Sequence, residues 1–223
     1  MNQWEIFLAP YRQAIDELKI KLKGLRKEYQ VTEHNSPIEF VTGRVKPITS
    51  IIDKANKRGI PFDRLREEMY DIAGLRMMCQ FVDDIDKVVE LLKQRKDFKV
   101  IEERDYIKDT KQSGYRSYHV IIEYPIETLD GQKTILAEIQ IRTLAMNFWA
   151  TIEHTLRYKY DGDYPPEIQK RLERAAEAAF LLDEEMSEIK EEIKEAQKFY
   201  SKNVQISMKI VGWSNAICDF IKR

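Results

Sequence analysis

The stretch SYHVIIEYPIETLDGQKTILAEIQIR, residues 117–142, alternates apolar and polar side chains on both sides of a turn. Within it, the segments 117–124 and 134–142 place apolar residues at every second position, which is typical of strands with one buried face. Between them, Asp130 precedes Gly131, and this dipeptide is a strong signal for a tight hairpin turn. We therefore predict that the two segments form a β-hairpin.

Two further strands and a helix precede this hairpin. Apolar runs predict strands at 74–82 and 98–107. The segment 83–96 between them begins with acidic residues and ends with basic ones, the distribution that a helix dipole favours. This part of the chain therefore reads as strand, helix, strand.

Other helices flank these strands. A helix is expected at 47–59, because Pro47 suits a first turn and Gly59 suits a helix end. A short helix is expected at 61–69, and a longer one from about 143 to 160. Together the elements predict an α+β fold, in which helices cover a mixed β-sheet.

Long helices are expected at both ends of the chain. Residues 3–29 are amphipathic, and residues 166–200 carry an apolar seam in steps of four and three. The seam could pack on its own domain or form an oligomer interface, and its length favours the interface. We predict one domain at 1–200 with its core at 43–160, and leave the apolar but irregular tail 203–223 unassigned. The seam consists of Ile168, Leu172, Ala175, Ala179, Leu182, Met186, Ile189, Ile193, Ala196 and Tyr200.

Composition restricts the class of protein. The formal net charge is −1, with 43% hydrophobic and 34% charged residues, so a soluble globular protein without strong overall attraction to nucleic acid or anionic membrane is expected. No apolar run reaches the roughly 18 residues of a membrane span, and no secretory leader opens the chain. Cys79 lies in an apolar run and is predicted to be a buried free thiol, which suits a cytoplasmic protein.

Strand alternation also places an unusual set of polar residues on one side of the sheet. A plain exposed face often carries Lys, Thr and Ser, whereas these positions carry side chains that bind ligands or transfer protons. The pattern alone leaves open whether this is an ordinary half-solvated face or a site. The residues are Arg76, His119, Glu138, Gln140 and Arg142.

Two carboxylates could share a metal ion. Asp71 lies just before the strand at 74–82, and Glu138 lies in the middle of the strand at 134–142. Magnesium often uses one or two protein carboxylates and leaves other positions to phosphate oxygens and water. If the two strands are close, these residues could hold Mg²⁺, although an acidic residue before a strand is common.

A possible anion site lies at GRVKPITS, residues 43–50. Arg44 and Lys46 precede the expected helix, and Ser50 lies in its first turns. Free backbone amides, the helix dipole and two cations attract anions. The segment is not a Walker A loop, and basic residues before helices are frequent.

The loop RDYIKDTKQSGYRSYH, residues 104–119, combines aromatic and basic side chains around Gly114. Tyr115 could present its ring to a nucleobase, while Lys108, Lys111 and Arg116 could bind phosphates. The alternative is that Tyr115 belongs to the core at the start of a strand.

Three blocks of this sequence closely resemble a known family. DIAGLRMMCQFVDDI at 71–85, RDYIKDTKQSGYRSYH at 104–119 and EIQIRTLAMNFWATIEH at 138–154 resemble the synthetase domain of RelA/SpoT-type alarmone synthetases. The chain is similar to the single-domain small alarmone synthetases of Gram-positive bacteria over about residues 3–200. The resemblance implies a fold like the polymerase-β type of nucleotidyltransferase. It also implies an enzyme of the stringent response that transfers pyrophosphate from ATP to the 3′-OH of GDP or GTP, giving ppGpp or pppGpp and AMP.

The resemblance implies roles for matching positions. Asp71 and Glu138 would hold Mg²⁺, with Glu138 also a candidate general base. ATP would be bound by Arg44, Lys46, Ser50, Lys54 and Arg76. GDP or GTP would be bound by Lys111, Tyr115, His119, Gln140 and Arg142, with Tyr115 stacked on guanine.

The family also suggests partners and an absent activity. Related single-domain enzymes are homotetramers, and some bind an activating alarmone between subunits. Matching positions here are Lys19, Lys23, Phe40, Thr42 and Asn147. Some relatives bind single-stranded RNA, for which the basic face of the first helix is the candidate, although it could simply be solvated. The family's hydrolase uses His-Asp metal ligands, and this chain has no His-Asp dipeptide, so hydrolysis is not expected.

Two other functions remain to be weighed. The chain could be a regulatory module that binds guanine nucleotide or RNA without catalysis, or a nucleotidyltransferase with another acceptor. Asp71 and Glu138 discriminate against the first, because two carboxylates repel an anion unless a metal intervenes. The blocks around Tyr115 and Glu138 favour the alarmone family over the second.

Overall fold

The computed structural model describes residues 3–33, 35–158, 160, 162 and 164–221, and for 158 and 201–221 it describes the backbone alone. The chain divides into two compact units, Met1–Asp183 and Glu184–Arg223. The first contains the whole sheet, and the second is part of the last helix.

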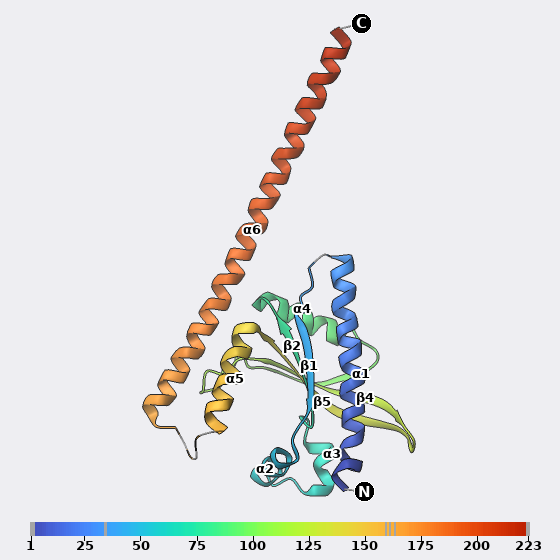
Figure 1. Cartoon of the computed structure of the whole chain (residues 1–223), viewed down its shortest axis with the longest axis vertical. Helices are drawn as coiled ribbons and strands as arrows, with labels where there is room; N and C mark the ends of the chain where they lie inside the picture. Colours follow the sequence, from blue (N-terminus) through green and yellow to red (C-terminus); the bar gives the residue numbers. More distant parts are fainter. Residues whose placement is uncertain (1–2, 34, 159, 161, 163, 222–223) are drawn as a thin grey trace. The chain divides into compact units, whose positions relative to one another are not determined.

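A five-stranded mixed sheet forms the centre of the first unit, with the order β1-β2-β5-β4-β3 (Figure 1). β2 pairs in parallel with β5, while the other neighbours are antiparallel. The predicted hairpin is confirmed, because Thr128 pairs with Gly131 at its tip and Gly131 has a φ of 96°. The strands are β1 (Phe40–Val45), β2 (Ala73–Cys79), β3 (Lys99–Asp105), β4 (Tyr118–Thr128) and β5 (Gly131–Thr143).

The edge strand β1 was not predicted from the sequence. For this part of the chain, the sequence predicts only a possible anion site at 43–50 and a helix from Pro47. The structure explains the glycine at position 43. A Cβ atom at Gly43 would lie 2.9 Å from Cγ2 of Ile15, so the close approach of the first helix requires a residue without a side chain. Phe40, Val41 and Val45 suit a strand, and pairing with β2 holds the segment as one despite the glycine.

The predicted helices are confirmed within a few residues, except that the last one continues well beyond the predicted end at residue 200. The second helix ends as expected at Gly59, which has a φ of 65° and donates its amide to the last turn. The short helix predicted at 61–69 is a 3-10 turn, Phe62–Arg64, followed by α3 (Leu65–Glu68). The others are α1 (Gln3–Thr32), α2 (Ile48–Arg58), α4 (Val82–Lys93), α5 (Leu144–Tyr158) and α6 (Pro166–Ile221).

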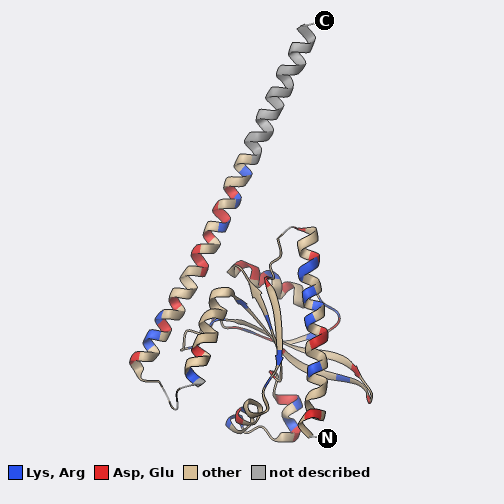
Figure 2. Ribbon diagram, viewed as in Figure 1, with Lys and Arg blue, Asp and Glu red and all other residues tan. Residues whose placement is uncertain are grey.

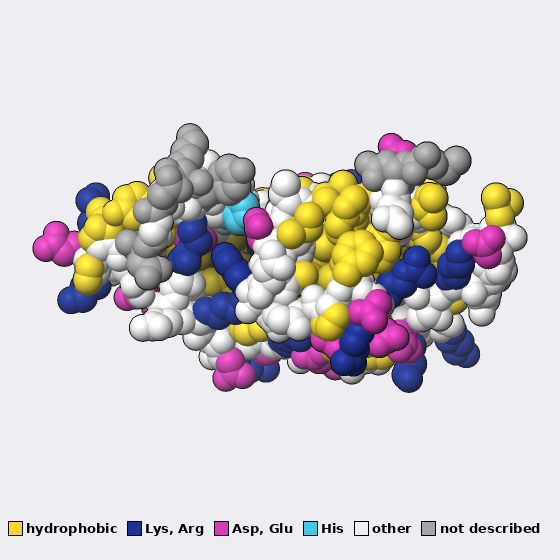
Figure 3. Space-filling model, turned by 90° about the horizontal axis from the view of Figure 1, so that it is seen from below, with side chains coloured by type: hydrophobic (Ala, Val, Ile, Leu, Met, Phe, Trp, Pro, Cys, Tyr) yellow, Lys and Arg dark blue, Asp and Glu magenta, His cyan; other side chains and the backbone are white. Residues whose placement is uncertain are grey.

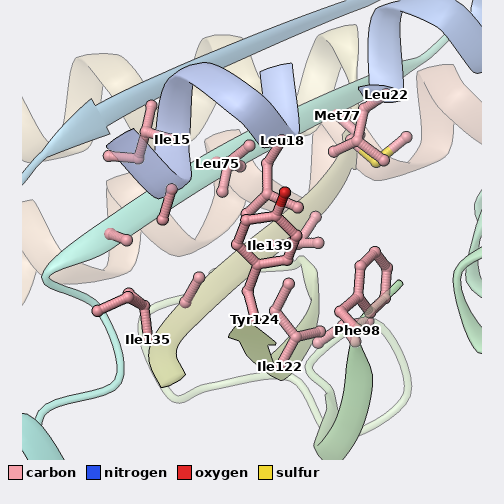
Figure 4. Packing of buried hydrophobic residues seen from close by; sticks show 14 of the residues in the cluster. Ile15, Leu18, Leu22, Leu75, Met77, Phe98, Ile122, Tyr124, Ile135 and Ile139 are labelled. Carbon is pink, nitrogen blue, oxygen red and sulfur yellow. The ribbon is translucent and has the colours of Figure 1, made fainter. Parts of the chain in front are cut away.

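The core lies between one face of the sheet and the helices α1 and α4. Leu18 of α1 is fully buried and faces the sheet, where it meets apolar residues of β2 and β5 such as Leu75 and Ile139 (Figure 4). These are the apolar positions that alternation predicted for the strands. The packing leaves the opposite face of the sheet free for the polar residues.

The last helix α6 begins at Pro166 and continues as backbone helix through the segment 203–221, which the sequence left unassigned. In the first unit its seam packs locally, because Leu172 and Ala179 lie against Trp149. In the second unit, seam residues such as Met186 and Ile193 are exposed. Acidic and basic residues follow one another along α6 up to residue 200 (Figure 2).

Two compositional predictions can be compared with the structure. Cys79 is a fully buried free thiol, as predicted, and burial raises its pKa well above the ordinary range. Among the described residues, no helix combines the length and apolar character needed to cross a membrane.

Candidate active site

The register of the sheet gathers the predicted polar residues on one face. Arg76 of β2 pairs with Gln140 of β5, which in turn pairs with His119 of β4. Residues that pair directly across neighbouring strands point to the same side of the sheet. Because Glu138 lies two residues before Gln140 and Arg142 two residues after it, the same face carries them as well.

Glu138 is the centre of a buried hydrogen-bonded chain. Its Oε1 atom lies 3.0 Å from Nδ1 of His119, and His119 Nε2 lies 2.8 Å from the hydroxyl of Tyr115. The side-chain amide of Gln140 donates to Oε2 of Glu138 at 2.7 Å. Burial raises the pKa of Glu138, but the hydrogen bonds and charge of His119, together with Gln140, outweigh it, so the pKa lies below its ordinary value. Glu138 is therefore an ionised acceptor at neutral pH.

Arg142 ties the end of β5 to the loop that carries Tyr115. This arginine is almost fully buried and donates to the hydroxyl of Tyr115, to Gln140 and to the hydroxyl of Ser117. Burial, opposed by the charge of Arg142, raises the pKa of Tyr115, so its phenol stays protonated. The tyrosine is consequently fixed at its hydroxyl end.

Asp71 lies directly before β2 and pairs with two lysines. Its Oδ2 atom is 3.0 Å from Nζ of Lys46 and 2.7 Å from Nζ of Lys54, which α2 carries. Burial raises the pKa of Asp71, but the two lysines lower it by more than burial raises it. The pKa of Asp71 is therefore below its ordinary value. Its other oxygen, Oδ1, is buried and has no hydrogen-bond partner among the described residues. A buried carboxylate oxygen normally has a partner, so this atom is suited to a ligand.

The two carboxylates fit a magnesium ion better than a metal held by protein alone. Gly74 of β2 pairs with Glu138 of β5, and Asp71 lies three residues before Gly74, so the two carboxylates lie on, or just before, neighbouring strands. The charge of Asp71 also acts to raise the pKa of Glu138. Within the described part of the chain, no three His, Cys, Asp or Glu side chains come together in a metal cluster. Magnesium needs only one or two protein carboxylates when phosphates complete its coordination.

Cations from several elements converge on this face. Burial lowers the pKa of Arg76, and the charges of Arg142 and Arg44 lower it further. Burial also lowers the pKa of Lys111. Neighbouring cations lower this pKa as well, while the charge of Glu138 acts to raise it. Figure 3 shows Lys and Arg side chains at several places around a broad hydrophobic patch on the face seen from below. Mutual repulsion of buried cations is relieved when an anion binds between them.

Tyr115 lines a cleft of about 630 Å³. Lys111 lies 4.8 Å from the centroid of its ring, and Arg142 lies 5.0 Å from it. The tyrosine is half-buried against Trp149, so it belongs partly to a small core and partly to the cleft. Besides Lys111 and Tyr115, the cleft is lined by Gln112, Ser113, Glu153, Arg157, Gly162, Tyr164, Gln169 and Leu172.

Sequence reasoning missed two residues at this site. Tyr106 lies with its ring centroid 5.1 Å from that of His119, and Lys111 lies 4.2 Å above its ring. Arg104 pairs with His119 across β3 and β4, and its charge acts on Lys111. Both residues lie within the loop 104–119 and at the end of the strand predicted at 98–107. The alternation of that strand, which places Arg104 and Tyr106 on the same side, is the signal that could have found them.

Two basic residues of the loop do not join the other cations. Lys108 is 81% exposed and pairs with Asp105 at 3.3 Å. Arg116 is turned toward α6, where it pairs with Glu177. The interpretation of Arg116 as a phosphate ligand is therefore wrong for this conformation, whereas that of the exposed Lys108 stays a prediction.

The remaining predicted residues are spread over several elements. Ser50 lies half-buried in the first turn of α2. Of the proposed alarmone contacts, Lys19 and Lys23 lie on α1, while Phe40 and Thr42 lie on β1. Asn147 on α5 has a buried side-chain oxygen with no hydrogen-bond partner in the described part of the structure. Among the described residues, no hydrogen bond or ion pair joins Asn147 to the other four.

Comparison with known proteins agrees with this geometry. Residues 43–163 match the family described as a region found in RelA / SpoT proteins. The chain is 61% identical over 201 residues to GTP pyrophosphokinase YjbM of Bacillus subtilis (strain 168), covering 90% of this chain and 95% of that protein.

Solved structures show the same fold. The crystal structure of small alarmone synthetase 1 from Bacillus subtilis bound to its product pppGpp has a TM-score of 0.83 and 61% identity, covering 86% of this chain and 98% of that chain. The same enzyme bound to AMPCPP has a TM-score of 0.77 and 58% identity, with coverage of 86% and 98%. With these similarities and the site face described above, the chain belongs to the RelA/SpoT family.

Proposed function

We propose that this protein is a GTP pyrophosphokinase of the small alarmone synthetase type. It transfers pyrophosphate from ATP to the 3′-OH of GDP or GTP and releases AMP with ppGpp or pppGpp. The observation that carries the proposal is the ionised, buried Glu138 beside converging cations and beside Asp71 with its unpartnered oxygen. The similar enzymes with bound pppGpp and AMPCPP support both the product and the donor.

The donor nucleotide is assigned to the region around α2. Arg44, Lys46, Ser50 and Lys54 bind the phosphates of ATP, aided by the backbone amides at the start of α2. Arg44 and Arg76 flank the adenine. Lys46 and Lys54, which pair with Asp71 in the structure, are within reach of the same anionic ligand.

The acceptor nucleotide is assigned to the cleft beside Tyr115. Its ring stacks on guanine, while Lys111 and His119 contact the phosphates. Gln140 and Arg142 shape this pocket from β5. Lys111 lies over the rings of Tyr106 and Tyr115, so its ammonium group is next to the ring that we assign to guanine.

Glu138 accepts the proton of the attacking 3′-OH. Its lowered pKa keeps it ionised, and its bond to His119 fixes the orientation of the carboxylate. Asp71 and Glu138 would hold Mg²⁺, which supplies charge neutralisation at the phosphate oxygens when bound. The remaining cations align donor and acceptor, and alignment with charge stabilisation is the main demand of phosphoryl-type transfer.

Further partners are part of the proposal. The protein acts in the cytoplasm as a homotetramer, supported by exposed seam residues such as Met186 and Ile193. An alarmone bound between subunits would contact Lys19, Lys23, Phe40, Thr42 and Asn147. Single-stranded RNA would bind the basic stretch that Figure 2 shows along α1.

A module that binds nucleotide or RNA without catalysis fits this geometry less well. The buried, ionised Asp71 and Glu138 would repel a bound anion unless a metal and a reaction used them. The two hypotheses differ in whether AMP is formed.

The decisive experiment incubates purified protein with ATP, Mg²⁺ and either GDP or GTP, and separates the nucleotides by anion exchange. We expect a more highly charged guanosine species together with an equal amount of AMP, and none of either with an Asp71→Asn variant that retains its fold. The faster acceptor identifies the preferred substrate. Binding of nucleotide without AMP formation, even after addition of ppGpp, would establish the binding module instead.

A further inference from the structure

Arg116 follows the nucleotide-binding candidate Tyr115, yet its side chain contacts α6 rather than the polar face of the sheet. Its Nη2 atom lies 2.7 Å from Oε2 of Glu177, and its guanidinium carbon lies 4.2 Å from the centroid of the Phe180 ring. The arginine side chain is only 12% exposed. A cation that is buried against a helix cannot bind phosphate in this conformation.

The backbone of the same loop rests directly on α6. Gly114 has a φ of +82°, and a Cβ atom there would lie 2.5 Å from Cβ of Ala176. Nη1 of Arg116 lies 3.5 Å from the carbonyl oxygens of both Gly114 and Ala176, so the guanidinium bridges loop and helix. The residues on both sides of Tyr115 are thus held against one helix.

The sheet holds Tyr115 from its other end. Its hydroxyl interacts with His119 and Arg142, which lie on β4 and β5. The helix is itself anchored, because the indole of Trp149 donates to the carbonyl of Leu172 at 3.0 Å. The direction of the Tyr115 ring therefore depends on α6 at the backbone and on the sheet at the hydroxyl.

We propose that Arg116 is a positioning residue, which acts with Glu177 and Phe180 of α6 to set the Tyr115 ring for the acceptor nucleotide. The proposal rests on the function proposed above, and it makes the first part of α6 a determinant of GDP or GTP affinity. The donor region at α2 shares none of these contacts in the described part of the chain. Loss of Arg116 should consequently raise KM for the acceptor and leave KM for ATP unchanged.

A double-mutant cycle tests this arrangement. We expect Arg116→Ala to raise the acceptor KM about tenfold, as loss of a hydrogen bond to a charged group commonly does. Phe180→Ala, which alters only the helix, should raise it about threefold. The double variant should resemble Arg116→Ala alone, because both changes remove one shared contact. Arg116→Lys should recover part of the affinity for the acceptor nucleotide. If Arg116→Ala does not fold, Arg116→Lys takes its place in the cycle.

Amide hydrogen exchange gives a readout that does not depend on activity. Exchange of residues 111–117 should be faster in Arg116→Ala than in the wild type. Lys133→Ala is the matched control, since it removes a basic residue from the ion pair with Asp130 in the β4–β5 hairpin. This control should change neither exchange of the loop nor either KM.

Several results would overturn the proposal. If Arg116 binds phosphate directly, Phe180→Ala will have no effect, or the two changes will add. An equal rise in KM for ATP, or unchanged exchange of the loop in Arg116→Ala, would also contradict it. If the wild type forms no AMP, the proposed function fails, while the exchange experiment still decides whether Arg116 holds the loop on α6.

Discussion

Replacement of Glu138 by glutamine separates the proposed chemistry from the architecture of the site. The side chain is 11% exposed, and its carboxylate oxygens contact His119 through Oε1 and accept a hydrogen bond from Gln140 at Oε2. Glutamine has nearly the same size, so no cavity forms. The variant loses the negative charge, and one acceptor oxygen becomes an amide donor, so it can neither take the proton nor hold Mg²⁺ as the carboxylate would.

The expected magnitudes follow from these contacts. A general base contributes typically about 10²–10⁴-fold, which corresponds to about 3–5 kcal/mol of transition-state stabilisation. In the folded state, a hydrogen bond to a charged group becomes a neutral one, a change of about 1 kcal/mol in the free energy of unfolding. For a domain of this size that lowers Tm by about 2–4 °C. The effect on rate should therefore far exceed the effect on stability.

The assay follows AMP formation at saturating ATP and acceptor, alongside thermal unfolding of the same preparations. Glu123→Gln is the matched control, because Glu123 lies on β4 and pairs with Lys99 at 4.0 Å outside the site. We expect the control to keep full activity. A Glu138→Gln variant with more than a tenth of the wild-type kcat would refute the role of Glu138 as base.

The pH dependence of stability gives an independent test of the same residue. The pKa of Glu138 is lowered in the folded chain from its ordinary value of 4.5. Its contribution to stability is therefore present above that ordinary value and is lost as pH falls through the lower folded value. The Glu138→Gln variant should lack this part of the acid destabilisation.

Three further changes probe the loop, the core and α6. Gly114→Ala should lower the free energy of unfolding by about 1–2 kcal/mol or more, measured by urea denaturation, because of its positive φ and the approach of Ala176. Leu18→Ala should cost about 2–5 kcal/mol in the same assay, since Leu18 is fully buried. Asp183→Asn should flatten the fall in Tm as pH rises through about 6. Burial, opposed by the hydrogen bond of Thr143, raises the pKa of Asp183 to about 6, so its favourable contribution is complete below the unfolded pKa and lost above the folded one.

Controls make these three results interpretable. Gly131→Ala shares the positive φ but meets no atom within 4 Å, so it should cost less than Gly114→Ala. Ile20→Ala on the exposed side of α1 should hardly change stability. If Gly114→Ala and Gly131→Ala lower the free energy of unfolding equally, the contact of Gly114 with Ala176 is contradicted. If Leu18→Ala and Ile20→Ala do so equally, the burial of Leu18 is contradicted. An unaltered pH profile for Asp183→Asn would contradict the assignment of the raised pKa to Asp183.

Local sequence patterns were sufficient for much of the fold. The turn at Asp130 and Gly131, the end of α2 at Gly59 and the two faces of β5 depend on residues close in sequence, through backbone angles and strand alternation. The three family blocks likewise identified Glu138 and Tyr115 as site residues before their surroundings were known.

Other features depend on contacts between distant parts of the chain. β1 is a strand because β2 offers its edge, while its own Gly43 weakens the local pattern. The parallel pairing of β2 with β5 brings Asp71 near Glu138, and alternation alone cannot specify which strands are neighbours. Arg116 is a further example. Its charge alone suggests a phosphate ligand, whereas in the structure it pairs with Glu177 of α6.

The sequence by itself therefore determined most of the elements, the polar positions of each strand and the family, since these follow from the order of side chains along each segment. Only the tertiary structure decided which of those side chains meet. Strand order and helix docking are set by burial and pairing across long sequence separations, and they placed Asp71 beside Glu138 and turned Arg116 from the site to α6.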